Sequence, residues 1–376
     1  MSYTVKQRGK KKKWYFRVFD KKGTLIATAS GFRTKKEAEK EALQIDLKAL
    51  AGLKINSSAS LYELWKEWFE VVVQPMGKDE ATLYKHQKRG DLINKFFGDT
   101  PATKIRFSQY QRKLNQYAEK VTKDTVQRLN AEVRKVIQFA KRDGLDIKDF
   151  TEGAIISGKR LSKTAAEKHI DNIADYYKIV RYLRSQLDYS KSVIPYYLYI
   201  SFKTGMRFGE VLGLTWDCVL WSEKAIHTYR RYDSSKYSWR PPKTVTSDRE
   251  VPIDNEVIAV LKKLQKEQKQ VLSDYHIDNP EGFLFYDKTF GVPTNNAINK
   301  QLRQILQDNS VRPYNLSTTG IRHTYASILL AKDIDIWIVA NVMGHKDIKQ
   351  VTQTYGHLLK EKRDKGHEQI RHLLSE

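Results

Sequence analysis

The sequence predicts a multidomain, mainly α-helical protein with small β-sheets. Its 376 residues exceed the length at which one hydrophobic core usually stops growing, so we expect two or three domains. Hydrophobic residues make up 40% of the chain and charged residues 30%, a composition that can build packed cores and argues against a disordered protein. Helical periodicity runs through most of the chain, and strand-like segments occur in two short stretches.

The chain is strongly basic and contains one cysteine. Lys and Arg total 67 against 44 Asp and Glu, a net charge of +23. This excess favours nucleic acid as the partner, and the alternative is a basic protein without a polyanionic partner. The single Cys218 excludes an intrachain disulfide and a thiolate zinc cluster. The most apolar run, residues 193–202, is shorter than the roughly 20 residues of a membrane helix, so we expect a soluble, cytoplasmic protein.

The first 54 residues predict a small sheet with one helix. They carry fifteen Lys or Arg and five Asp or Glu, an excess of ten positive charges. Residues 14–19 and 24–30 have strand composition and flank a turn, which predicts a hairpin. Thr34 and Glu37 then have the spacing of a helix N-terminal capping box. We interpret the basic surface as a DNA contact, and the alternative is a solvated lysine-rich face.

A linker and an all-helical region follow. Residues 56–60 are small and polar, and predict a linker that ends at the N-cap of a helix from Leu61. Helical patterning continues to about Arg142, with stops at residues 98–101 and 143–144. We interpret its first apolar stripe as core rather than as a base-stacking surface. The members of this stripe are Leu61, Leu64, Trp65, Trp68 and Phe69.

From residue 161 to the end, helices alternate with one β-rich island. Residues 224–232 and 247–253 are expected to be strands, with the turn sequence PPKT at 241–244 between them. Five charged or nucleophilic side chains stand in short motifs of this region. They are Arg207 in TGMRFGE, Lys243 in PPKT, Arg322 in GIRHT, His345 in MGH, and Tyr355 ten residues after His345.

In order and spacing these motifs resemble those of the tyrosine recombinases, and within them the integrases of phages and integrative conjugative elements. The resemblance covers essentially the whole chain. It implies an arm-type DNA-binding domain at residues 1–55, a helical core-binding (SAM-like) domain at 56–150, and a catalytic domain with a C-terminal helix at 161–376. These boundaries agree with those drawn from composition.

The resemblance also implies a function and partners. The expected protein is a site-specific recombinase that integrates and excises a mobile element as a homotetramer on double-stranded DNA, at core and arm attachment sites. The resemblance also implies an accessory DNA-bending or excision factor. The expected location is the bacterial cytoplasm, in association with the nucleoid. In the arm domain, the expected DNA contacts are Lys11, Lys12, Lys13 and Arg17.

The residue types account for the implied chemistry. A tyrosine has a pKa near 10, so Tyr355 needs positive potential and an aligned phosphate before it can attack. Arg207 and Arg322 would bind the non-bridging oxygens, and His345 would donate a further hydrogen bond. Lys243 would protonate the departing 5′-oxygen as general acid. The product is a 3′-phosphotyrosyl bond that keeps the ester energy, so no ATP, metal or other cofactor is expected.

Three further residues surround this set. Glu210 follows Arg207 by three residues, so we expect it to orient the arginine. His323 follows Arg322 directly, so we expect its side chain to point elsewhere and to support the site without touching the phosphate. The family usually has a histidine three residues before the second arginine, where this chain has Thr319. A threonine hydroxyl can donate a hydrogen bond but cannot act as a base near neutral pH.

Two other functions remain open at this point. One is a catalytically degenerate recombinase fold that serves as a DNA-binding or architectural protein, which Thr319 alone favours. The other is a relaxing type IB topoisomerase, which shares the chemistry. The basic N-terminal hairpin argues against the topoisomerase, because it suggests a second DNA contact on flanking arm sites.

Overall fold

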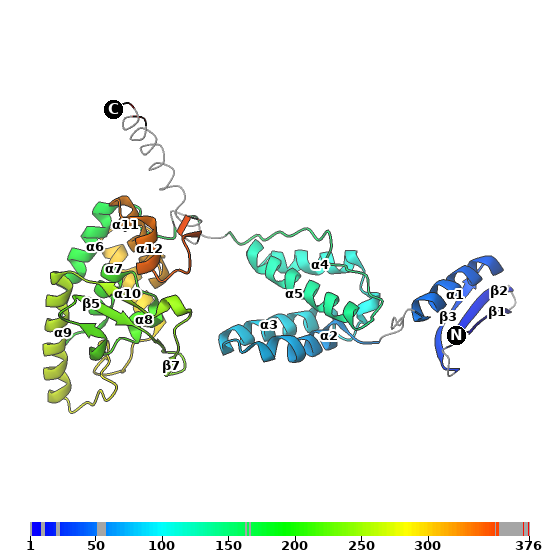
Figure 1. Ribbon diagram of the computed structural model, residues 1–376, viewed down its shortest axis with the longest axis horizontal. Coiled ribbons are helices and arrows are strands. Elements are labelled where there is room, and N and C mark those ends of the chain that lie inside the picture. The colour runs from blue at the N-terminus through cyan, green and yellow to red at the C-terminus, as the bar shows by residue number, and fades with distance from the viewer. Residues whose placement is uncertain are drawn as a thin grey trace. The chain divides into compact units, whose positions relative to one another are not determined.

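The computed structural model is mainly helical with small antiparallel sheets, as the sequence predicts (Figure 1). It falls into two compact units, Met1–Ser162 and Lys163–Glu376. None of the helices it describes combines the length and the apolar character needed to cross a membrane. The residues that the structure describes are 2–8, 12–19, 23–50, 58–161, 164, 167–349, 351–352, 371 and 375.

The N-terminal part of the first unit is a three-stranded antiparallel sheet with one helix. Its elements are β1 (Ser2–Arg8), β2 (Lys13–Phe19), β3 (Leu25–Phe32) and α1 (Lys35–Leu50), with strand order β1-β2-β3. Phe16 and Val18 point from β2 into a small core with Ala27 and Ala42, so α1 covers this face of the sheet. The predicted hairpin is confirmed by the pairing of β2 with β3.

Two further predictions bear on this part of the chain. The capping box is confirmed, since the Glu37 amide donates to Thr34 Oγ1 at 3.2 Å and the Thr34 amide donates to Glu37 Oε2 at 3.3 Å. Strand β1 was not predicted. Its residues alternate among polar and basic types, and Val5 supplies the one aliphatic side chain that packs on the core, so the segment lacks a strand-like apolar pattern.

The rest of the first unit is helical. Its elements are α2 (Leu61–Trp68), the π-helical turn η1 (Phe69–Val73), η2 (Gln74–Met76), α3 (Glu80–Phe97), η3 (Ala102–Lys104), α4 (Phe107–Ala118) and α5 (Lys123–Arg142). Ser60 caps α2 as predicted, and α3 and α5 end at the predicted stops. The apolar stripe is core, because its side chains are at most 7% exposed. The first two residues of the predicted linker, 56 and 57, lie outside the described residues, which resume at Ser58.

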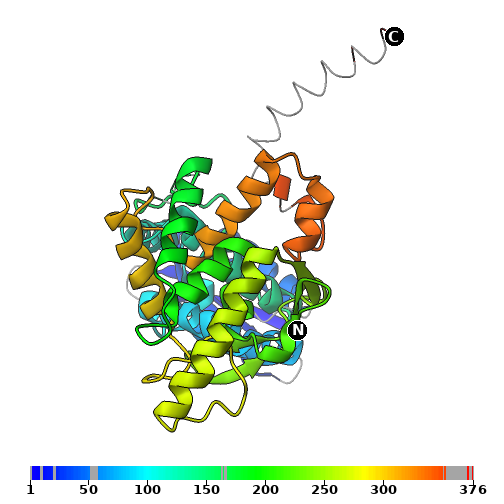
Figure 2. The same ribbon diagram turned by 90° about the vertical axis from the view of Figure 1, so that its left-hand side faces the viewer.

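The second unit surrounds one buried helix. Its helical elements are α6 (Ile173–Ser185), α7 (Ile194–Thr204), α8 (Phe208–Leu212), η4 (Trp216–Cys218), η5 (Val245–Ser247), α9 (Asn255–Asp274), α10 (Asn295–Asp308), α11 (Thr318–Ala331) and α12 (Ile336–Val342). Helix α7 packs against α6, α8, α9, α10 and α11, and its side chains are buried on every face. Figure 2 turns this unit toward the viewer, with the long helix α9 (yellow-green) at the front. The most apolar run of the sequence therefore forms the centre of this unit.

The β-rich island of the second unit differs from the prediction. Strands β4 (Val219–Leu220), β5 (Ala225–Thr228) and β8 (Arg249–Pro252) form one antiparallel sheet, and β6 (Arg231–Asp233) and β7 (Ser238–Arg240) form a separate hairpin. The single strand predicted at 224–232 was therefore wrong. The strand is interrupted at residues 229–230, where the Arg230 guanidinium lies 3.7 Å from the Trp239 ring centre and donates to Thr215 Oγ1 at 2.9 Å. Lys243 consequently follows β7 and precedes η5.

Candidate active site

A cavity of about 800 Å³ in the second unit gathers residues from segments far apart in the sequence. It lies where the start of α8, the segment before η5, the first turns of α11 and the segment after α12 meet. Its lining includes seven residues singled out in the sequence, namely Arg207, Glu210, Lys243, Thr319, Arg322, His323 and His345. The structure thus brings together the motif residues that it describes.

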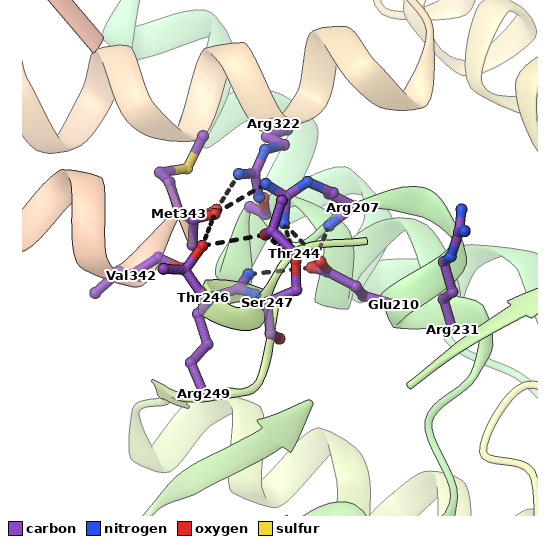
Figure 3. Close-up of polar contacts among 12 residues, drawn as sticks. Arg207, Glu210, Arg231, Thr244, Thr246, Ser247, Arg249, Arg322, Val342 and Met343 are labelled. Atoms are coloured by element: carbon purple, nitrogen blue, oxygen red, sulfur yellow. Dashed lines mark hydrogen bonds and ion pairs between the residues drawn. The ribbon is translucent and has the colours of Figure 1, made fainter. Parts of the chain in front are cut away.

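Arg207 is held at the N-terminus of α8 by four hydrogen bonds. Its Nη1 donates to Glu210 Oε1 at 2.7 Å and to Ser247 Oγ at 3.1 Å, and its Nη2 donates to the Gly344 carbonyl at 3.0 Å (Figure 3). Its backbone amide donates to Glu210 Oε2 at 3.0 Å. The glycine two positions earlier, Gly205, has a φ of +60°, and a Cβ there would lie 2.2 Å from the Tyr325 ring. Only glycine can therefore make this turn into α8.

Arg322 is buried in α11 and reaches the same segment after α12. It is 7% exposed. Its Nη1 donates to the Gly205 carbonyl at 2.9 Å, and its Nη2 donates to the Met343 carbonyl. Arg207 and Arg322 therefore bind consecutive carbonyls, those of Gly344 and Met343, immediately before His345. The two guanidinium groups converge on one side of the cavity.

Glu210 is a buried carboxylate between two arginines. It is 4% exposed, and Arg249 on β8 donates from Nη2 to its Oε2 at 3.1 Å (Figure 3). Burial alone raises the pKa of Glu210, but the cations Arg249 and Arg207 outweigh burial and hold this pKa below its usual value. The carboxylate is therefore ionised near neutral pH, and it accepts hydrogen bonds from both Arg207 and Arg249.

Arg249 was missed in the sequence analysis. The strand containing it alternates buried and exposed residues, with Arg249 and Val251 buried and Glu250 exposed. This alternation is the signal that could have identified it, because an arginine at an inward position of a strand needs fixed partners.

Lys243 and His345 occupy two edges of the cavity. Lys243 is exposed and directly precedes Thr244, the N-cap of η5, whose Oγ1 lies 2.9 Å from Ser247 Oγ. Thr246 Oγ1 donates to the Gly344 carbonyl at 3.2 Å, which ties η5 to the segment carrying His345. The His345 amide donates to the Ala340 carbonyl at 2.9 Å and ends α12.

Thr319 and His323 line the cavity from one side of α11. Thr319 is exposed and precedes Arg322 by three residues. His323 was expected to point elsewhere, but it also lines the cavity, because positions 319 and 323 are one helical turn apart and share a face. Burial, with the positive neighbours His169, Arg322 and Lys168, lowers the pKa of His323 to about 4. Its imidazole is therefore neutral at physiological pH.

Two predicted site residues, Tyr355 and Lys11, lie outside the described residues, as does the C-terminal helix expected after Tyr355. The last described residues before Tyr355 are Val351 and Thr352, and Val351 is buried in a cluster with Val339 and Met343. The residues that the structure describes contain no group of three or more His, Cys, Asp or Glu side chains suited to hold a metal ion.

The other predicted DNA contacts lie on or beside the sheet of the first unit. Phe16 and Val18 face α1, so the alternate residues Lys13 and Arg17 point to the opposite face and are exposed. The register pairs Lys13 with Arg8 across β1, and exposed Lys6 stands opposite Tyr15. The face turned away from α1 is therefore basic. Lys12 immediately precedes β2 and is exposed.

Comparison with known proteins identifies the family. The model of the phage integrase family matches residues 174–362. The chain is 26% identical over 385 aligned residues to "Tyrosine recombinase XerC-like" of Caldanaerobacter subterraneus subsp. tengcongensis, and the alignment covers 96% of this chain and 97% of the relative.

Solved integrases share the fold. The Tn1549 transposon integrase in complex with transposon right end DNA matches with a TM-score of 0.65 at 14% identity, over 81% of this chain and 99% of that one. A lambda integrase tetramer bound to a Holliday junction matches with a TM-score of 0.56 at 12% identity, over 92% and 96% of the two chains. The family match spans half of the chain, including every motif residue lining the cavity, so the chain belongs to the phage integrase family and is a tyrosine recombinase, an enzyme of site-specific DNA recombination.

Proposed function

We propose that this recombinase cleaves DNA at the described cavity, with Tyr355 as nucleophile and Arg207, Lys243, Arg322 and His345 as the groups that activate the phosphate. One observation carries the proposal. Arg207 and Arg322, which are 115 residues apart in the chain, bind consecutive carbonyls beside His345. Two forked cations in fixed positions form a binding site for a phosphate, because each can donate to one non-bridging oxygen.

The reaction is a single displacement at phosphorus. The phenolic oxygen of Tyr355 attacks, its proton passes to solvent, and the bond from phosphorus to the 5′-oxygen breaks. Lys243 gives its proton to that oxygen, while Arg207, Arg322 and His345 stabilise the charge that develops on the phosphate. The 3′-phosphotyrosyl bond is then attacked by a 5′-hydroxyl of the partner DNA, which rejoins the strand. Lys243 suits the acid role because its exposed side chain stands at an edge of the cavity.

The neighbouring residues adjust the site. Glu210 keeps Arg207 in place, as its two bonds to the arginine indicate. The Thr319 hydroxyl donates a hydrogen bond to the phosphate from the position where the family usually has a histidine. His323 supports α11 as a neutral imidazole, in keeping with its lowered pKa.

The DNA is held by all three proposed domains. Residues 1–55 bind arm-type sites through the basic face of the sheet, with Lys11, Lys12, Lys13 and Arg17 as contacts. Residues 56–150 bind the core site, as do residues 161–376, which also perform the chemistry. We further propose that four copies act together on double-stranded DNA, as in the lambda integrase tetramer, with the help of an accessory DNA-bending or excision factor, at the nucleoid of a bacterial host cell.

The test is the capture of a covalent protein–DNA adduct. The wild-type chain is incubated with nicked duplexes whose core sequence is randomised, because a nick beside the cleavage point lets the short product diffuse away and traps the adduct. The adducts are then sequenced to identify a cleaved duplex. Tyr355→Phe, which removes only the hydroxyl, should bind that duplex and form no adduct. Absence of an adduct from the wild-type chain would overturn the proposed function, and a wild-type level of adduct from the phenylalanine variant would exclude Tyr355 as nucleophile.

A further inference from the structure

Arg249 joins three segments that carry proposed catalytic residues. Its Nη2 donates to Glu210 Oε2 at 3.1 Å, its Nε donates to the Val342 carbonyl at 2.7 Å, and its Nη1 donates to the Ser247 carbonyl at 3.1 Å. These partners belong to α8, to the end of α12 and to η5. Arg249 is 9% exposed and is not among the residues that line the cavity.

We infer that Arg249 is a positioning residue of the strand-cleavage step, which aligns Arg207 and His345 by fixing Glu210 and the segment at residues 342–344. This inference rests on the proposed function. Through Glu210 it acts on Arg207, because the same carboxylate binds both guanidinium groups (Figure 3). Through the Val342 carbonyl it holds the segment to which Arg207 and Arg322 also bind and from which His345 projects.

The space around Arg249 allows little adjustment. Gly344 has a φ of +62°, and a Cβ there would lie 2.8 Å from Arg249 Nη1 and 2.8 Å from the Thr246 carbonyl oxygen. The guanidinium, η5 and the glycine are therefore in close contact. A lysine at position 249 would present one nitrogen in place of three, and could not reach partners that lie in different directions.

The two cations beside Glu210 make the pH dependence of cleavage a measurement that tests whether Arg249 positions Arg207. Arg207 and Arg249 face the carboxylate directly. The other charged or titratable groups that line the cavity are Arg231, Tyr232, Asp233, Arg240, Lys243, Arg322, His323, His345 and Lys346. Removing Arg249 leaves a buried carboxylate with one of its two cations, so the pKa of Glu210 rises. A group with a raised pKa becomes protonated as the pH falls through that pKa. Arg207 then loses its anionic partner at the acidic end of the range, and regains it as the pH rises.

The experiment compares single-turnover cleavage by full-length variants on the duplex that the wild-type chain cleaves. Arg249→Met should bind this duplex with unchanged affinity and cleave it at least roughly tenfold more slowly near pH 7. Its rate should rise with pH more steeply than that of the wild type. In the double variant Arg249→Met/Glu210→Gln the extra pH dependence should vanish, because no carboxylate remains to titrate. Arg249→Lys should recover part of the thermal stability but little of the rate.

A matched control is Arg230→Met. Arg230 is also a partly buried arginine of this unit with a polar partner and a stacked ring, and it does not contact Glu210. The Arg230→Met variant should have a lower melting temperature than the wild type, and its cleavage rate should show no additional pH dependence.

The possible results separate the inference from the proposed function. If the wild type cleaves and Arg249→Met and Arg249→Lys match its rate and pH profile, only the inference is overturned. It is overturned as well if neither variant folds, because Arg249 is then a residue of the fold, or if Arg230→Met shows the same pH profile as Arg249→Met. If the wild type forms no adduct, the proposed function fails first.

Discussion

The basic face of the N-terminal sheet and the cavity of the second unit both present cations, but they hold them differently. Lys13 and Arg17 are exposed on the same face of β2. Arg207 and Arg322 are instead fixed by carbonyls and by Glu210, and Arg322 is 7% exposed. Exposed side chains can follow a phosphate backbone and contribute affinity that depends on salt, whereas fixed donors can stabilise one arrangement of charge. The first region is therefore suited to binding DNA and the second to catalysis.

Among the residues that the structure describes, the largest effect is expected from Lys243→Ala. If Lys243 protonates the leaving 5′-oxygen, its loss should slow cleavage of an ordinary phosphodiester by about 10³-fold. A duplex with sulfur in place of the bridging 5′-oxygen should be cleaved at nearly the wild-type rate, because a thiolate leaves without protonation. Cleavage rates of the two duplexes are measured in parallel. Equal slowing on both would assign Lys243 to phosphate binding instead.

Arg207→Ala should have the next largest effect. Loss of one fixed donor to the developing charge should lower the cleavage rate by about 10²-fold, with duplex binding changed much less. Arg184→Ala is the control, since this arginine is 57% exposed and pairs with Glu256 away from the cavity. Single-turnover rates at saturating protein check the difference. A loss confined to affinity would show that Arg207 serves binding, as the sheet cations do.

On the sheet, Lys13→Ala and Arg17→Ala should each change how strongly DNA affinity depends on salt concentration. Each removes about one phosphate contact, so the slope of log affinity against log salt concentration should become shallower by about one. The duplex for this measurement is one that the wild-type chain selects from a random-sequence pool by binding. Lys36→Ala on α1 is the control, because α1 covers the opposite face of the sheet. If all three variants change the slope equally, the basic face has no special part in binding.

The smallest effect is expected at Thr319. A histidine at this position would add a donor or a base to a cavity that already holds two arginines, so Thr319→His should cleave at the wild-type rate or up to about tenfold faster. Thr319→Val keeps the shape without the hydroxyl and should slow cleavage modestly. A folded, DNA-binding histidine variant that cannot cleave, together with a valine variant of unchanged rate, would show that Thr319 is a packing residue.

The sequence predicts the parts of the fold that rest on local physics. The Thr34 capping box, the Ser60 cap and the helix stops are set by neighbours within a few residues, and they are confirmed. The break at Arg230 was not predictable in this way, because it depends on a ring nine residues later and on Thr215. Strand β1 was missed because its pairing with β2, rather than its own composition, makes it a strand.

The candidate site likewise contains residues that the sequence could predict and residues that it could not. Order and spacing of motifs identified Arg207, Arg322 and His345 as a set, and the structure places them around one cavity. Arg249 was missed because it has no motif of its own, and its partners come from three other segments. Tyr355 lies outside the described residues and stays a prediction.

One paired measurement tests most directly whether the sheet cations serve DNA binding and the cavity arginines serve cleavage. Arg322→Ala and Arg17→Ala are compared with the wild type, each for the single-turnover cleavage rate at saturating protein and for the salt dependence of duplex binding. We expect Arg322→Ala to cleave about 10²-fold more slowly with an unchanged salt slope, and Arg17→Ala to cleave normally with a slope shallower by about one. The account is contradicted if Arg322→Ala changes only the salt slope, or if Arg17→Ala slows cleavage of the saturated duplex.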